Sequence, residues 1–232
     1  MLVFKQLCSM VEKHFVTRRT ARVYYNEELP SAECKYVWIC LHGYGQLGPY
    51  FTRNFNVLDS EEHWVVAPEG LSKMYLEGVY GRVGASWMTK EDRLTEIDDY
   101  MYYLDRIMED VQSKVKHCKT KPKCIVLGFS QGAATACRWV LDGKVVPQHL
   151  VLWSGIFPPD LKLEPPFSKS LKVWQLIGDE DEYMNENRWA ENEQIMETIG
   201  LKAQQVPFKG KHKIYPDVLE EFTAQLMAND KA

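Results

Sequence analysis

The feature that most constrains this chain is the segment Gly128-Phe129-Ser130-Gln131-Gly132, a G-x-S-x-G pattern that follows the short apolar run 124–127. The run is aliphatic and too short for a buried helix, which predicts a central strand. The small residues at 132–134 predict a helix that packs close to the sheet. Such a sharp strand-to-helix turn exposes the serine hydroxyl at the carboxyl edge of the sheet. This context favours a nucleophilic Ser130 over an ordinary serine in a glycine-flanked turn.

A nucleophilic serine needs a general base, and after this kind of turn the chain order is serine, then an acid, then histidine. Of the six histidines, His149 and His212 follow Ser130. His149 begins an apolar run and is expected at the amino end of a strand, on the opposite edge of the sheet. His212 follows the predicted strand 203–208 and precedes the final helix. We therefore predict His212 as the base.

The acid is expected after the intervening strand 171–177, where the chain reads Gly178-Asp179-Glu180-Asp181-Glu182. We favour Asp181 because the first residues after the glycine are needed to make the turn, and Asp179 is the alternative. A solvated acidic loop or a calcium site would also explain this cluster. A calcium loop needs ligands at continuing alternate positions, and Tyr183-Met184 interrupts them.

A serine mechanism also needs donors for the oxyanion. The predicted strand 36–41 runs into His42-Gly43-Tyr44-Gly45-Gln46, a glycine-bearing loop of the kind that supplies one backbone N–H. We predict the backbone N–H groups of Tyr44 and Gln131 as the two donors. His42 precedes the nucleophile, so we interpret it as a structural hydrogen-bonding residue.

These segments together resemble the phospholipase/carboxylesterase family of α/β-hydrolases, whose relatives include the acyl-protein thioesterases. The matching motifs extend from about residue 36 to 214 and are Leu41-His42-Gly43-Tyr44-Gly45, Gly128-Phe129-Ser130-Gln131-Gly132-Ala133, the Gly178 to Asp181 turn and Gly210-Lys211-His212-Lys213-Ile214. The resemblance implies an α/β-hydrolase fold. It also implies nucleophile Ser130, acid Asp181, base His212 and oxyanion donors at Tyr44 and Gln131.

The chain departs from the family pattern around the acid. The family usually has His-Gly before the acid turn and a proline with a nearby valine after it. Here Ile177 replaces the histidine and Glu182-Tyr183-Met184 follows the acid. The choice between Asp179 and Asp181 is therefore left to the structure, and the pocket wall is expected to differ from that of the thioesterases.

Strands and helices alternate along the rest of the chain, which predicts a mainly parallel central sheet with helices on both faces. An amphipathic stripe predicts a long helix over 91–117. The remaining predicted elements are strands at 21–25, 63–67 and 150–155 and helices at 50–58, 183–199 and 216–227. We expect a single domain over 1–232, in which residues 1–10 are a dispensable extension.

The glycine-rich stretch 68–90 lacks a strand-to-helix turn, so it predicts a loop over the site and not a phosphate cradle. Its aromatic side chains are candidates for the wall of an acyl pocket, although they could equally cover the core of the sheet. The candidate pocket residues are Tyr80 and Trp87 from this loop, where Ser86-Trp87 matches a dipeptide of the resembling family, together with Trp153 and Phe157.

Composition excludes several classes of protein. The net charge of −4 argues against nucleic-acid binding, which needs a basic face. No stretch approaches the roughly 20 apolar residues of a membrane span, and the start of the chain lacks the features of a secretion signal. The six cysteines form no C-x-x-C pair, so we expect buried thiols and a cytoplasmic protein. We expect neither a metal nor an organic cofactor, and the sequence leaves a homodimer open.

These observations predict a serine hydrolase that cleaves carboxylic esters of short to medium acyl chains through an acyl-enzyme. Lysophospholipids or acyl-thioesters are the alternative substrates. A non-catalytic hydrolase-fold protein that binds a lipid or a partner in the same pocket is an alternative of another class. A peptidase is less favoured because nothing in the sequence marks a gating domain.

Overall fold

The computed structural model describes residues 10–161, 170–184, 186–198 and 200–231. Its centre is a seven-stranded sheet in the order β1-β3-β2-β6-β7-β8-β9, and β4 and β5 form a separate two-stranded sheet. The strands are β1 (Val23–Tyr25), β2 (Tyr36–Leu41), β3 (His63–Pro68), β4 (Ser72–Tyr75), β5 (Val83–Ser86), β6 (Lys123–Phe129), β7 (His149–Trp153), β8 (Lys172–Gly178) and β9 (Ala203–Phe208). Only β1 pairs antiparallel in the large sheet. The predicted mainly parallel sheet is confirmed.

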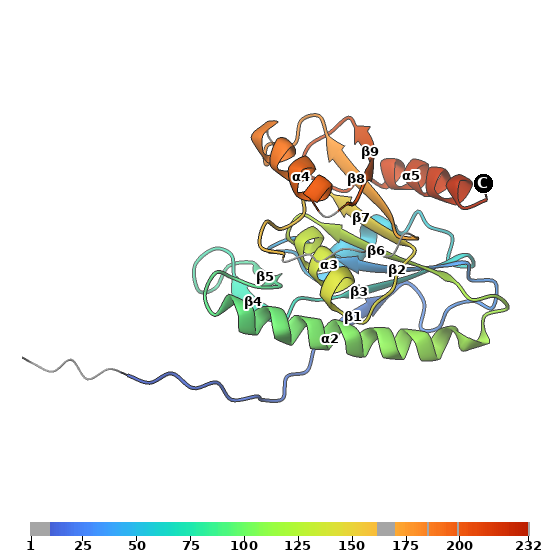
Figure 1. Cartoon of the computed structure of the whole chain (residues 1–232). Coiled ribbons are helices and arrows are strands. Elements are labelled where there is room, and N and C mark those ends of the chain that lie inside the picture. Colours follow the sequence, from blue (N-terminus) through green and yellow to red (C-terminus); the bar gives the residue numbers. More distant parts are fainter. Residues whose placement is uncertain (1–9, 162–169, 185, 199, 232) are drawn as a thin grey trace, which may run out of the picture.

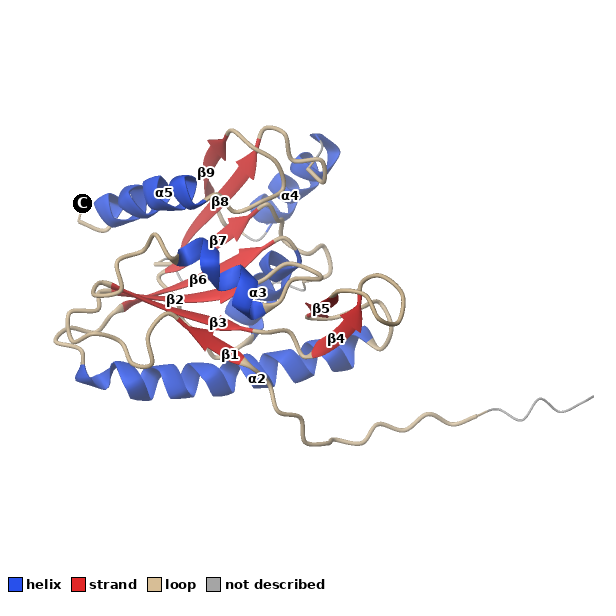
Figure 2. Ribbon diagram, turned by 180° about the vertical axis from the view of Figure 1, so that it is seen from behind, coloured by secondary structure: helices blue, strands red, loops and turns tan. Residues whose placement is uncertain are grey.

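Helices pack on both faces of this sheet, as predicted (Figures 1 and 2). They are α1 (Gly48–Phe51), α2 (Arg93–Lys114), α3 (Gln131–Asp142), α4 (Glu186–Thr198) and α5 (Pro216–Asn229), with 3₁₀ turns η1 (Thr52–Phe55) and η2 (Val115–His117). Core residues of α2, α3 and α4 share one cluster with one face of the sheet. Those of α1, η1 and α5 share a second cluster with the other face.

The interior strand β2 shows why the sequences of these strands are continuous apolar runs. All of its residues are buried, and alternate side chains enter opposite clusters. Ile39 and Leu41 pack with α2 and α3, whereas Trp38 and Cys40 pack with α1 and α5. A parallel strand covered on both faces has no polar side, so the apolar pattern is unbroken. Of the six predicted buried thiols, four are buried and free: Cys34, Cys40, Cys124 and Cys137. Cys118 is partly exposed, contrary to the prediction, and Cys8 lies outside the described residues.

Two segments differ from the sequence prediction. The helix predicted over 50–58 is instead the short α1 followed by η1. Pro49 starts this helix, but Asn54 and Asn56 favour turns over helix propagation, so the segment ends in a 3₁₀ turn. The stretch 68–90 contains the β4–β5 hairpin, which the sequence analysis interpreted as irregular loop.

The β4–β5 hairpin stands apart from the main sheet (Figure 2). Backbone hydrogen bonds join it to the loop after β2, from Gly45 N–H to the Ala85 carbonyl at 2.8 Å and from Ala85 N–H to the Gln46 carbonyl at 3.2 Å. A Cβ at Gly84 would lie 2.5 Å from the Gly45 carbonyl oxygen. The glycine therefore allows this close approach, and the contact cannot be read from local sequence.

Within the described residues, no helix is long and apolar enough to cross a membrane. Most of the expected N-terminal extension, residues 1–9, lies outside the described part of the chain. Residues 10–20 are exposed, and part of this segment lies beside α2, where His14 contacts Asp92 and Thr95 (Figure 1).

Candidate active site

Ser130 lies in a sharp turn between β6 and α3, at the carboxyl edge of the sheet. Its backbone has φ 53° and ψ −115°, a conformation that a non-glycine residue rarely adopts. The turn is held by hydrogen bonds from Ser130 N–H to the Trp153 carbonyl and from Ala133 N–H to the Ser130 carbonyl, both 3.0 Å. Strain of this kind is characteristic of a serine presented above a sheet.

The two flanking glycines make this turn sterically feasible. A Cβ at Gly128 would lie 2.2 Å from the Gly132 carbonyl oxygen, and a Cβ at Gly132 would lie 2.1 Å from the Leu41 carbonyl oxygen. Atoms cannot approach that closely without a backbone shift. The glycines of the G-x-S-x-G pattern therefore bring the first turn of α3 against the ends of β2 and β6.

Ser130, His212 and Asp181 form one chain of hydrogen bonds. His212 Nε2 lies 2.8 Å from Ser130 Oγ, and His212 Nδ1 lies 2.9 Å from both carboxylate oxygens of Asp181. In sequence, His212 is 82 residues from Ser130 and 31 residues from Asp181. The Asp181 side chain is fully buried and the His212 side chain is 14% exposed. With Nδ1–H directed at the carboxylate, Nε2 is free to accept the serine proton.

Asp179, the alternative acid, makes a different contact from Asp181. Its Oδ1 accepts a hydrogen bond from Gly210 N–H at 3.0 Å, whereas Asp181 Oδ1 accepts one from Tyr183 N–H at the same distance. Asp179 therefore braces the loop that leads to His212, and no hydrogen bond joins it to the His212 ring among the described contacts.

Two aromatic rings contact the His212 imidazole. The ring of Phe129 lies 5.0 Å away between centroids, and that of Tyr183 lies 4.6 Å away at 60°. Tyr183 is 57% exposed and stands at the surface of the site. Sequence reasoning missed it as a site residue. The sequence could have indicated Tyr183, because it lies two residues after Asp181 in the segment that departs from the family pattern.

The predicted oxyanion donors lie on the two loops that meet at this edge. Gln131 is the first residue of α3, where an N–H has no acceptor within the helix. In the loop after β2, the N–H groups of Gly43, Gly45 and Gln46 are all hydrogen bonded. Among the described residues, no hydrogen bond is found from Tyr44 N–H. Both amides are therefore free to bind an oxyanion.

The Gln131 side chain has a second function that the sequence did not indicate. Its Nε2 donates to the Met88 carbonyl at 2.8 Å, and its Oε1 accepts from Trp87 N–H at 3.2 Å. Trp87 Nε1–H in turn donates to the His42 carbonyl at 2.8 Å. This network joins the loop after β5 to both candidate oxyanion loops.

His42 is buried, in keeping with its interpretation as a structural residue. Its Nε2 accepts from Gly70 N–H at 2.9 Å, which leaves Nδ1–H to donate to the Gly43 carbonyl at 2.8 Å. Burial lowers the pKa of His42 because the charged ring would lose its hydration. The ring therefore stays neutral and fixes the loop beside Tyr44.

The four predicted pocket residues differ widely in burial. Trp87, Trp153 and Phe157 are at most 1% exposed, whereas Tyr80 is 95% exposed. A fully buried ring meets a substrate only if its neighbours move, so the role of pocket wall stays a prediction for these residues. A cavity of about 1000 Å³ beside the Tyr44 loop has other walls: Tyr44, Gly45, Gln46, Leu47, Tyr50, Phe51, Asn54, Leu76, Arg82 and Val83.

One group of side chains among the described residues has the spacing of a metal site. Ligand atoms of Glu12, His14 and Asp92 lie within 4.8 Å of one another, and all three residues are exposed. The cluster belongs to the N-terminal segment and the start of α2. Ser130, His212 and Asp181 do not belong to it.

Comparison with known proteins gives a consistent result. The sequence profile of the phospholipase/carboxylesterase family matches residues 28–229. Among solved structures, the esterase PE8 is 23% identical, with a TM-score of 0.66 over 90% of this chain and 99% of that chain. Acyl-protein thioesterase 2 of Zea mays is 18% identical, with a TM-score of 0.67 over 90% and 99%. The Bacillus cereus carboxylesterase is 14% identical, with a TM-score of 0.63 over 88% and 92%.

At these identities the structural matches show the fold alone, and that fold is the predicted α/β-hydrolase fold. No curated protein sequence matches this chain.

Proposed function

This chain belongs to the phospholipase/carboxylesterase family, and from that premise we propose that it is a serine hydrolase that cleaves carboxylic esters through an acyl-enzyme. The observation that carries the proposal is the chain of hydrogen bonds from Ser130 through His212 to Asp181. A serine hydroxyl becomes a nucleophile when a neighbouring base accepts its proton.

In the proposed mechanism, Ser130 Oγ attacks the ester carbonyl while His212 Nε2 accepts the hydroxyl proton. Asp181 holds the ring by its Nδ1–H and stabilises the imidazolium that forms. The amides of Tyr44 and Gln131 stabilise the oxyanion. His212 then protonates the departing alcohol. In the second half of the reaction, His212 accepts a proton from water, the water oxygen attacks the acyl carbonyl, and His212 returns the proton to Ser130 Oγ as the acid leaves.

We further propose that the acyl chain is short to medium in length. The supporting observation is the cavity beside the Tyr44 loop, whose apolar side chains include Leu47, Leu76 and Val83. Burial of the chain there stabilises the complex by about 0.8 kcal/mol for each methylene group removed from water. The preference is therefore expected to rise with chain length until the cavity is filled.

The test is hydrolysis of a p-nitrophenyl ester series from acetate to palmitate by the wild-type protein and by Ser130→Ala. We expect a peak between short and medium chains and a loss of about 10⁶-fold in kcat for the variant. Ser60→Ala, at an exposed serine in the turn before β3, at the amino edge of the sheet opposite Ser130, is the matched control and should keep full activity.

Other outcomes of this series identify the alternatives. A Ser130-dependent peak at palmitate would indicate a lipid or acyl-thioester substrate. Absence of hydrolysis at every length, together with no labelling of Ser130 by a serine-reactive phosphonate, would overturn the proposal in favour of a binding protein with this fold.

A further inference from the structure

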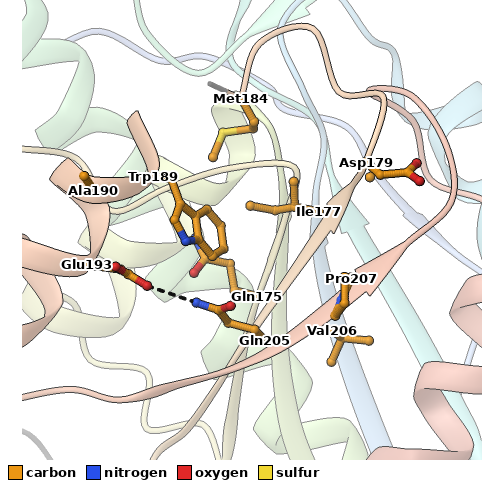
Figure 3. Close-up of a pocket in the computed structure, with 11 residues that line it drawn as sticks. Gln175, Ile177, Asp179, Met184, Trp189, Ala190, Glu193, Gln205, Val206 and Pro207 are labelled. Atoms are coloured by element: carbon orange, nitrogen blue, oxygen red, sulfur yellow. Dashed lines mark hydrogen bonds between the residues drawn. The ribbon is translucent and has the colours of Figure 1, made fainter. Parts of the chain in front are cut away.

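A second cavity, of about 400 Å³, lies between α4 and the ends of β8 and β9 (Figure 3). It borders both ends of the turn that carries Asp181, at Asp179 and Met184. Small-molecule sites commonly measure about 300–1000 Å³, so its size is sufficient for a small ligand. It is lined by Gln175, Ile177, Gly178, Asp179, Met184, Trp189, Ala190, Glu193, Gln205, Val206 and Pro207. Neither Ser130 nor His212 contributes to its wall, so it is distinct from the proposed catalytic site.

Most of the cavity wall is apolar. The Trp189 ring extends from α4 toward the strands, and Ile177 and Met184 lie beside it (Figure 3). Ile177, Met184 and Trp189 are partly exposed. Ile177 and Met184 stand in the segments where this chain departs from the family pattern. Two of the lining residues therefore lie where the chain departs from the family pattern. An apolar group that enters the cavity gains contact with an aromatic and two aliphatic side chains.

The floor of the cavity is fixed by hydrogen bonds. Gln175 Oε1 accepts from Asn192 Nδ2 at 3.1 Å, and Gln175 Nε2 donates to the Gly155 carbonyl at 3.3 Å. Asn192 Oδ1 accepts from Phe157 N–H at 3.0 Å. Gln175 and Asn192 are both at most 2% exposed. These bonds connect α4 to β8 and hold the space open, so binding needs little reorganisation.

The charge of the wall selects among ligands. Its ionisable residues are Asp179 and Glu193, and it contains no lysine, arginine or histidine. Asp179 accepts from Gly210 N–H and its carboxylate points away from Trp189 (Figure 3). Glu193 accepts from Gln205 Nε2 at 3.4 Å, on the same side of the cavity as the Trp189 ring. The neighbouring Arg188 donates to the Tyr183 carbonyl at 3.0 Å and does not line the cavity.

An anion in this cavity would approach the Glu193 carboxylate, and the lining residues supply no lysine, arginine or histidine to compensate the charge. A cation would be attracted both by Glu193 and by the face of an indole ring. We propose that the cavity is a binding site for a small apolar amine, protonated at neutral pH. Its apolar part packs against Trp189, Ile177 and Met184, and its ammonium group pairs with Glu193. The occupant also contacts both ends of the turn that carries Asp181.

Three probes of matched shape test the proposal: 2-phenylethylamine, 2-phenylethanol and 3-phenylpropionate. Binding is measured on the full chain by the shift of the ¹³C-methyl signal of Met184, assigned with Met184→Leu. This readout needs no hydrolysis, so it is independent of the proposed function. We expect the amine to bind about tenfold more tightly than the alcohol, and the carboxylate to bind most weakly.

Variants identify the site. Ala190→Phe adds a ring to the cavity wall and should abolish the Met184 shift with the amine and the alcohol. Ala224→Phe, at an exposed alanine of α5, is the matched control and should bind as the wild type does. Glu193→Gln keeps an acceptor for Gln205 but removes the charge, so it should reduce the preference for amine over alcohol to about threefold or less.

The proposal is overturned if the amine leaves the Met184 signal unmoved. It is also overturned if 3-phenylpropionate binds as tightly as the amine, if Ala190→Phe binds the amine normally, or if Glu193→Gln keeps the full preference for the amine.

Discussion

The turn around Ser130 and the turn around Asp181 lie at the same edge of the sheet, yet they are packed very differently. At the first, a Cβ on Gly132 would come within 2.1 Å of a backbone oxygen. At the second, the chain borders a cavity of about 400 Å³, and Tyr183 is 57% exposed. One turn has no spare volume, and the other has room beside it.

The difference reflects what each side chain requires from its turn. Ser130 needs a strained backbone whose neighbours approach within contact distance, which only glycine allows. Asp181 needs only a buried carboxylate, held by Tyr183 N–H and His212. Many turns can meet that requirement. Residues 182–184 can therefore differ from the family pattern while the distance to His212 stays at 2.9 Å.

The largest expected effect separates the two acids of the second turn. Asp181→Asn should lower kcat by about 10⁴-fold, because the amide no longer holds the His212 ring in the required tautomer. Asp179→Asn keeps an acceptor for Gly210 N–H and should lower kcat less than about threefold. Steady-state kinetics on the best ester of the series measures both. Equal losses in the two variants would contradict our assignment of the acid.

The next effect tests the close packing of the first turn. Gly132→Ala should destabilise the protein by about 3 kcal/mol, because the added Cβ forces the first turn of α3 away from β2. Urea unfolding measures the change. Gly78→Ala is the control, since it has φ 56° but no atom within 4 Å of the added Cβ, and should cost about 1 kcal/mol. If Gly132→Ala is no more destabilising than the control, the close approach of Gly132 to the Leu41 carbonyl oxygen does not limit the packing of this turn.

A smaller effect is expected from the exposed ring of the second turn. Tyr183→Ala removes the ring that contacts the His212 imidazole at 4.6 Å, a contact worth about 1 kcal/mol, and should lower kcat/KM about fivefold. Tyr183→Phe keeps the ring and should match the wild type. Tyr102→Ala, an exposed tyrosine on α2, should also match it. A loss in Tyr183→Phe equal to that in Tyr183→Ala would assign the effect to the hydroxyl group.

The last prediction concerns the pH dependence of stability that two buried histidines cause. Burial lowers the pKa of His42 and of His63, whose Nδ1 accepts a hydrogen bond from Trp38 Nε1–H. Below pH 6.5 the unfolded chain binds protons that the folded chain does not. Stability should therefore fall as the pH decreases from 7.5 to 5.5, by at most about 1.4 kcal/mol per pH unit for each histidine.

His63→Asn should make this fall less steep, because asparagine presents a similar acceptor to Trp38 without titrating. Urea midpoints at pH 7.5, 6.5 and 5.5 measure the slopes of wild type and variant. A midpoint that rises on acidification, or an unchanged slope in the variant, would show that these rings are not held neutral by burial.

The sequence by itself determined the strands of the main sheet, most of the helices and the sharp turn that carries Ser130. Apolar runs marked β2 and β6 because strands covered on both faces carry no polar side. The G-x-S-x-G pattern marked the sharp turn because its glycines are a local steric requirement. Chain order then singled out His212 and left Asp179 and Asp181 open, since both occupy the same post-strand turn. These features depend on residues close together in sequence.

Only the tertiary structure decided which groups meet. It joined His212 to Ser130 across 82 positions, gave Asp181 and not Asp179 the contact with the ring, and placed Tyr183 against that ring. The hairpin β4–β5 and the cavity beside α4 were also invisible in the sequence. Each depends on how separate elements pack together. That packing is determined by side-chain volumes and hydrogen-bond geometry between segments that come together only in the folded chain.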